Sequence, residues 1–225
     1  MRLDDPVTPA SGDTTQHWSV VFPVKVLSAA KSRLAPGTPA PGELALAFFR
    51  DAIAAAVATP RVGRVVVATS DARVGASAES VGAIVVADDG HPGINAAARW
   101  GAEHCGDTRG IAILVSDLPC LTPLSLETAL TAAEQHATSF LADLEGIGTT
   151  MWCATAPHAV DPHFGSDSRR AHLAAGAVDL VAGHARLVDD LERARCDVDT
   201  EDALYRARVL GVGPATLAAL TTRTD

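Results

Sequence analysis

From Trp18 onward, short apolar runs alternate with longer segments rich in Ala and Leu. Trp18–Val26 is almost wholly apolar and predicts a strand, whereas Glu43–Ala58 carries its apolar residues at helical spacing and predicts a helix. Further strands are predicted at Arg64–Ala68, Ala83–Ala87, Ile111–Val115, Ser139–Ala142 and Thr150–Ala154. Further helices are predicted at Asp71–Ser80, Gly93–Cys105, Leu124–His136, Ser168–Ala175, Glu201–Val209 and Pro214–Leu220.

This alternation is typical of right-handed βαβ crossovers, which give a mainly parallel sheet with helices on both faces. After Ser139 the alternation changes, and we expect Thr150–Ala154 to pair as an antiparallel or mixed strand. Residues 1–17 are rich in Asp, Pro, Ser and Thr and lack the apolar core of a signal peptide. We therefore expect a disordered N-terminal tail (1–17) and a single α/β domain (18–225).

Composition and net charge indicate which kinds of partner and which cellular compartment to expect. With 18 Lys and Arg against 27 Asp and Glu, the net charge of −9 argues against a nucleic-acid partner. No apolar run approaches the roughly 20 residues that span a bilayer, so no membrane partner is expected. The four cysteines lack the spacing of a zinc site and are expected as buried thiols in a reducing cytoplasm; they are Cys105, Cys120, Cys153 and Cys196.

In open α/β sheets, ligands bind beyond the carboxyl ends of the strands, and polar residues gather there in this chain. Lys25 stands at the end of the first predicted strand, Lys31 and Arg33 follow that strand, and Asp117 follows Ile111–Val115. Carboxylates without Cys or His suit Mg²⁺, while Lys and Arg suit phosphates. Further candidates at this edge are Asp88–Asn95, Asp143, Gly146–Thr150, Phe164–Arg169 and Cys196–Thr200.

This mixture predicts phosphoryl or nucleotidyl transfer. The sequence argues against a P-loop kinase, because Lys31-Ser32 lacks the preceding glycines of that motif. A Rossmann dinucleotide site is not supported either, because Gly211-Val212-Gly213 follows a predicted helix and not a strand.

Several candidates also have a purely structural interpretation. Asp117 could cap the turn that follows it, and Thr200 could cap the next helix. Lys25 lies inside the predicted first strand, where a buried ammonium group needs a partner, and this favours a functional role.

For two further groups of residues we favour a structural role over a functional one. Arg169, Arg170 and His172 are expected on a solvated helix face, with anion contact as the alternative. Trp100 and Trp152 are expected in the core and not as platforms for a stacked base.

The run Phe22–Leu34, FPVKVLSAAKSRL, resembles the opening motif of the guanylyltransferases that make the deazaflavin coenzyme F-420. Four later segments are similar to later motifs of that family, in the same order and at similar spacing between about residues 18 and 215. They are Ser116–Pro119, Gly146–Thr150, Phe164–Ser168 and Cys196–Thr200. The resemblance implies a nucleotide-diphospho-sugar-transferase-like (MobA-like) fold, a three-layer α/β/α sandwich around a mostly parallel mixed sheet.

The same resemblance implies a reaction and its site. Members join the GMP part of GTP to a small phosphorylated acid and release pyrophosphate. By the motif match, Asp117 and Asp197 would bind Mg²⁺, and Thr149, Gly165 and Ser168 would bind the acid. The GTP phosphates would be bound by Lys25, Lys31 and Arg33.

The acid is expected to be phosphoenolpyruvate, because the closing motifs most resemble the actinobacterial branch of the family. Ile147 stands where Thr is usual and Ser166 where Pro is usual, so 2-phospho-L-lactate and 3-phosphoglycerate stay open as alternative acids. A sugar nucleotidyltransferase of the same fold and a non-catalytic nucleotide-binding partner are the competing functions. A homodimer also stays open.

Overall fold

The centre of the fold is a mixed sheet of seven strands in the order β3-β2-β1-β4-β6-β5-β7. It belongs to a computed structural model that describes residues 17–27, 41–88, 90–155, 160–182 and 191–221. Neighbouring strands are parallel except at β6, which is antiparallel to both β4 and β5. The strands are β1 (Trp18–Pro23), β2 (Val62–Ala68), β3 (Ile84–Val86), β4 (Gly110–Leu114), β5 (Thr138–Ala142), β6 (Thr149–Ala154) and β7 (Val178–Asp179).

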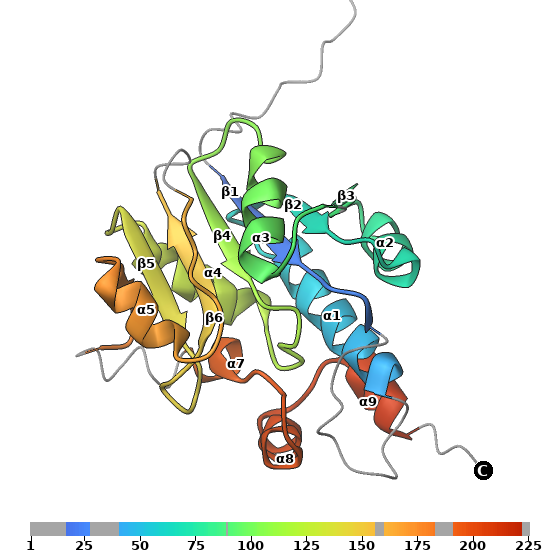
Figure 1. Ribbon diagram of the computed structural model, residues 1–225. Helices are drawn as coiled ribbons and strands as arrows, with labels where there is room; N and C mark the ends of the chain where they lie inside the picture. The colour runs from blue at the N-terminus through green and yellow to red at the C-terminus, as the bar shows by residue number, and fades with distance from the viewer. Residues whose placement is uncertain (1–16, 28–40, 89, 156–159, 183–190, 222–225) are drawn as a thin grey trace, which may run out of the picture.

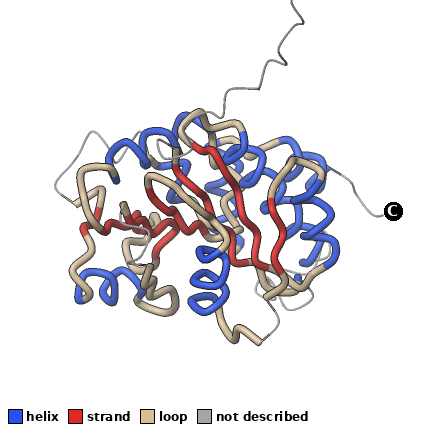
Figure 2. Tube along the Cα trace, turned by 90° about the horizontal axis from the view of Figure 1, so that it is seen from above, coloured by secondary structure: helices blue, strands red, loops and turns tan. Residues whose placement is uncertain are grey.

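Helices cover both faces of this sheet, and Figure 2 shows the strands running between them. The described helices are α1 (Pro41–Val57), α2 (Ala72–Glu79), α3 (Ile94–Glu103), α4 (Pro123–Ala133), α5 (Ser168–Ala174), α7 (Glu192–Arg195), α8 (Glu201–Leu210) and α9 (Pro214–Thr221). Side chains of α1, α2, α4 and α7 share one buried cluster with one face of the sheet. Side chains of α3 share a second cluster with the other face, which α5 also borders (Figure 1).

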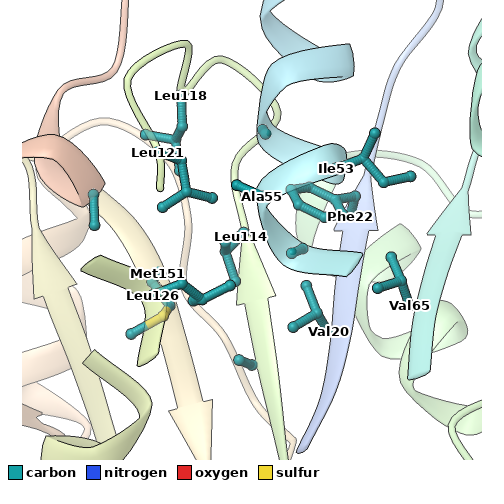
Figure 3. Close-up of a cluster of buried hydrophobic side chains, with 14 of the residues drawn as sticks. Val20, Phe22, Ile53, Ala55, Val65, Leu114, Leu118, Leu121, Leu126 and Met151 are labelled. Carbon is teal, nitrogen blue, oxygen red and sulfur yellow. The ribbon is translucent and has the colours of Figure 1, made fainter. Parts of the chain in front are cut away.

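The larger cluster is built from strand residues that point to the same face. Val20 and Phe22 of β1 lie beside Val65 of β2 and Leu114 of β4, beneath Ile53 of α1 (Figure 3). All six residues of β1 are buried, as expected for a central strand that is covered on both faces. The core therefore holds the carboxyl ends of β1 and β4 side by side.

Side-chain caps begin α2 and α8. Asp71 caps α2 by accepting hydrogen bonds from the backbone N–H groups of Arg73 and Val74. Thr200 accepts from the N–H of Ala203 and begins α8, so the structural role expected for this threonine is confirmed.

The mixed α/β sheet and the antiparallel pairing of β6 are confirmed, and so is burial of the four cysteines. Trp152 is buried as expected, but Trp100 is not a core residue. It is half-buried, stacks on His91 with ring centroids 4.6 Å apart, and donates from Nε1 to the carbonyl of Ala87.

Residues 1–16 of the expected N-terminal tail lie outside the described residues, as do Lys31 and Arg33. Across the part of the chain that the structure describes, none of the helices has the length and apolar character needed to cross a membrane.

Candidate active site

A cleft of about 410 Å³ opens where β1 and β4 end and where β6 begins. Because β6 runs antiparallel to β4, its first residue lies at the same edge of the sheet as the last residues of the parallel strands. Every predicted site residue that the structure describes lines this cleft: Lys25, Asp117, Thr149, Gly165, Ser168 and Asp197. The structure therefore brings together residues that are far apart in the sequence.

Lys25 differs from the expectation. The first strand ends at Pro23, so Lys25 lies beyond the strand and its side chain is exposed. Pro23 has no N–H to donate, and the last ladder-like contact is made by the N–H of Val24 with the carbonyl of Ala68. Lys25 is thus not the buried ammonium group that the sequence predicted, but it still lines the cleft.

Carboxylates crowd one side of the cleft. Asp117 follows β4, Asp143 follows β5, and Asp197 and Asp199 follow α7. Burial, together with the negative charges of Asp117, Asp143 and Asp199, raises the pKa of Asp197 to about 8. A bound cation would stabilise the ionised form of a carboxyl group in these surroundings.

The donor atoms on this side fit a hard divalent cation. Carboxylate oxygens of Asp143, Glu145 and Asp197 lie within 4.8 Å of one another. Oxygen ligands of this kind suit Mg²⁺ or a similar ion, whereas zinc prefers Cys and His. Asp143 and Glu145 thus stand beside the predicted ligand Asp197, although the motif comparison did not assign them.

Asp143 also holds the turn that leads into β6. Its Oδ1 accepts from the N–H of Ile147 at 2.9 Å and its Oδ2 from the N–H of Gly148 at 2.7 Å. The buried guanidinium of Arg195 fixes the backbone beneath, donating to the carbonyls of Ala142 and Asp143 at 2.9 and 2.8 Å. The turn is therefore positioned by buried polar contacts.

Hydrogen-bond donors also line the cleft. Thr149 and Ser168 are buried in its wall, and Gly165 lines it as well. Gly165 has a φ of +149°, which L side chains rarely adopt, and a Cβ there would meet only open space. The backbone conformation, and not lack of room, therefore requires glycine at this position.

Asn95 of α3 anchors the segment that carries Gly165. Its Nδ2 donates to the carbonyl of Phe164 at 2.9 Å, and its Oδ1 accepts from the Phe164 N–H at 2.8 Å. From the sequence, Asn95 was expected at the functional edge of the sheet, but without a role of its own. The two residues are 69 positions apart, and no spacing in the sequence indicates their contact.

The predicted solvated face of α5 is correct only in part. Arg170 is exposed and pairs with Asp167, whereas Arg169 pairs with the buried Asp179 at 2.9 Å. His172 is completely buried and contacts Thr149, so its assignment to a solvated face was wrong.

Comparison with known proteins places this fold and site in a family. The MobA-like NTP transferase domain model matches residues 48–209. A phosphoenolpyruvate guanylyltransferase of Streptomyces coelicolor is 44% identical over 208 residues, covering 90% of this chain and 95% of that protein. The protein of the same name from Mycobacterium ulcerans is 39% identical, covering 91% and 94%.

Solved structures with the same fold are more distant in sequence. A nucleotidyl transferase from Methanothermobacter has a TM-score of 0.53 at 17% identity, covering 86% of this chain and 96% of the other. Its likeness extends to the fold alone, whereas the first two relatives match over nearly their whole length. The chain therefore belongs to the phosphoenolpyruvate guanylyltransferase family, within the MobA-like NTP transferases.

Proposed function

We propose that this chain transfers GMP from GTP to phosphoenolpyruvate, giving enolpyruvyl-diphospho-guanosine and pyrophosphate, as a step of coenzyme F-420 biosynthesis. One observation carries the proposal: a single cleft is lined both by a group of carboxylates and by the buried hydroxyl donors Thr149 and Ser168. The carboxylates suit a divalent cation and the hydroxyl groups suit a compact anion. The names of the relatives supply the reaction class.

In this reaction a phosphate oxygen of phosphoenolpyruvate forms a bond to the α-phosphorus of GTP. The bond from that phosphorus to the bridging oxygen of the β-phosphate breaks, and pyrophosphate leaves with the electron pair. The attacking phosphate is already largely dianionic near neutral pH, since the second pKa of a phosphoester is about 6. No general base is needed, and the task of the protein is to hold two anions in line.

Each group of residues has its own role in the proposed reaction. Thr149, Gly165 and Ser168 bind the acid through hydroxyl and backbone N–H donors. Lys25, Lys31 and Arg33 bind the triphosphate and stabilise the negative charge that grows on pyrophosphate. Asp117 and Asp197 hold Mg²⁺, with Asp143 and Glu145 near enough to share it. When bound, this cation supplies charge screening between the reacting phosphates.

The test is a turnover assay on the purified chain with GTP, Mg²⁺ and each acid in turn, with pyrophosphate release as the readout. Release with phosphoenolpyruvate, and much less with 2-phospho-L-lactate or 3-phosphoglycerate, supports the proposal. Turnover only with another acid would reassign the substrate. GTP binding without pyrophosphate release from any acid would leave a nucleotide-binding partner in place of an enzyme.

A cytoplasmic location accompanies this proposal. Cys105, Cys120, Cys153 and Cys196 are free and buried, which suits a reducing compartment where GTP and phosphoenolpyruvate are available.

A further inference from the structure

His172 of α5 lies behind the acid-binding side of the cleft and is completely buried. Its ring stacks on Phe140 with centroids 5.3 Å apart and meets the edge of Phe164 at 5.6 Å. Both ring nitrogens have a polar partner. Nε2 lies 2.8 Å from the backbone nitrogen of His163, and Nδ1 lies 3.0 Å from Oγ1 of Thr149.

These partners determine where the ring carries its proton. A backbone N–H can only donate, so Nε2 must accept and therefore carries no hydrogen. A neutral imidazole then has its hydrogen on Nδ1, which donates to Thr149 Oγ1. Burial and the charge of His163 together lower the pKa of His172 to about 4, although a backbone hydrogen bond at Ser168 acts in the opposite direction, so the ring is neutral at physiological pH.

The tautomer in turn constrains the hydroxyl of Thr149. Because Nδ1 is a donor, Oγ1 accepts from His172 and cannot donate to it. The hydroxyl hydrogen is left for another acceptor, and Thr149 lines the cleft. We propose that His172 is a positioning residue that fixes Thr149 as a hydrogen-bond donor to an anionic oxygen of the phosphorylated acid.

This role of His172 rests on the proposed function, in which the cleft binds a phosphorylated acid. It also gives a physical reason why the pocket would prefer anionic groups to neutral ones. A hydroxyl with a free choice of direction can either donate or accept, and so it tolerates neutral groups. A hydroxyl whose acceptor side is engaged by the ring favours carboxylate and phosphate oxygens. The same ring also holds the N–H of His163, next to Phe164 and Gly165, so one side chain joins two parts of the acid pocket.

Two substitutions separate the two hydrogen bonds of the ring. In His172→Gln the side-chain carbonyl can replace Nε2 as the acceptor for His163, but the donor to Thr149 is lost. In His172→Asn the amide can replace Nδ1 as the donor to Thr149. We expect His172→Gln to raise KM for phosphoenolpyruvate about tenfold with KM for GTP unchanged, and His172→Asn to recover most of that loss.

A double-mutant cycle with Thr149→Val tests whether His172 acts through this hydroxyl. The valine variant should raise KM for phosphoenolpyruvate, and adding His172→Gln should raise it little further. Asp51→Asn is the control for lost stability alone, because Asp51 binds the N–H groups of Ala215 and Thr216 and lies outside the cleft wall. It should leave both KM values unchanged.

The tautomer can be read directly from the wild-type protein by ¹⁵N NMR of the imidazole, with no variant needed. We expect a protonated Nδ1 and an unprotonated Nε2. A protonated Nε2, or fully additive effects of the His172 and Thr149 substitutions, would overturn the positioning role while leaving the guanylyltransferase proposal standing. Loss of the guanylyltransferase proposal would appear instead as absence of wild-type turnover, with the NMR result unaffected.

Discussion

The side chain of Asn95 pairs with the backbone of Phe164 through both of its polar atoms, as donor to the carbonyl at 2.9 Å and acceptor from the N–H at 2.8 Å. This pairing joins the beginning of α3 to the segment that carries Gly165. Asn95→Leu removes both hydrogen bonds and leaves two backbone groups without these partners. We expect a loss of about 1–3 kcal/mol in the free energy of unfolding and a higher KM for phosphoenolpyruvate.

Urea unfolding and steady-state kinetics measure the two effects of Asn95→Leu. The matched control is Glu103→Gln, at an exposed position of the same helix, which should change neither. A variant that loses stability but keeps its KM would show that Asn95 supports the fold without shaping the acid pocket.

Asp117→Asn and Asp197→Asn should each lower kcat by at least about a hundredfold, because loss of a metal ligand removes several kcal/mol of transition-state stabilisation. Without divalent cation, Asp197→Asn should also raise the free energy of unfolding, since it removes a buried carboxylate that three others repel. Turnover at saturating Mg²⁺ and urea unfolding in chelator measure these effects. Near wild-type turnover in either variant would remove that residue from the metal site, and Asp107→Asn serves as an exposed control outside the cleft wall.

Gly148→Ala should reduce turnover, because a Cβ at this position would collide with the carboxylate of Asp143. That carboxylate would then lose its hydrogen bonds to the turn that precedes Thr149. Gly75→Ala is the matched control, since its Cβ would meet Val85 Cγ1 at an ordinary 3.7 Å within α2. It should stabilise the protein by about 0.5–1 kcal/mol and leave activity unchanged. Equal kinetics in the two variants would show that the turn tolerates displacement of Asp143.

Lys25→Ala should lower kcat and raise KM for GTP while the free energy of unfolding stays within about 0.5 kcal/mol, because its side chain is exposed. Arg208→Ala, an exposed cation in the last turn of α8, is the control for net charge. If both variants slow turnover equally, general attraction of anions would explain the effect in place of contact with the triphosphate.

His172 should make stability depend on pH. Its pKa is lowered by burial from 6.5 to about 4 in the folded protein, so only the unfolded chain binds its proton between these values. Stability is therefore full above about pH 6.5 and falls as the pH drops toward about 4, by up to about 3 kcal/mol. Urea unfolding across this range should show a shallower fall in His172→Gln, and parallel curves would contradict the lowered pKa.

The pattern of apolar residues predicted the longer elements because each of them buries a repeated face of its own. It missed β7 and α7, since two and four residues are too few to show a period. β7 forms because Val178 and Asp179 pair with β5, which is a contact between distant segments.

The residues of the candidate site also fall into those that the sequence could place and those that it could not. Residues that follow strands, such as Asp117, could be placed at the edge of the sheet from topology alone. The supporting residues Asn95, His172 and Arg195 could not, because their roles depend on backbone groups at least nine positions away. His172 also sits beside two exposed or half-exposed arginines, so its neighbours in sequence give the wrong indication of its burial.

Because β6 is antiparallel to β4, residues reach the cleft in two different ways. Residues from β1 and β4 enter it at the free ends of strands, where long connections follow. Thr149 enters through a hairpin, in which Ala142 of β5 is paired with Thr149 itself. Lengthening or shortening the tip of that hairpin, at Glu145 to Ile147, would reshape the acid pocket and also move Glu145 and Asp143, while leaving the ends of β1 and β4 in place. One short hairpin on this scaffold therefore couples the choice of acid to the carboxylates that would hold the cation.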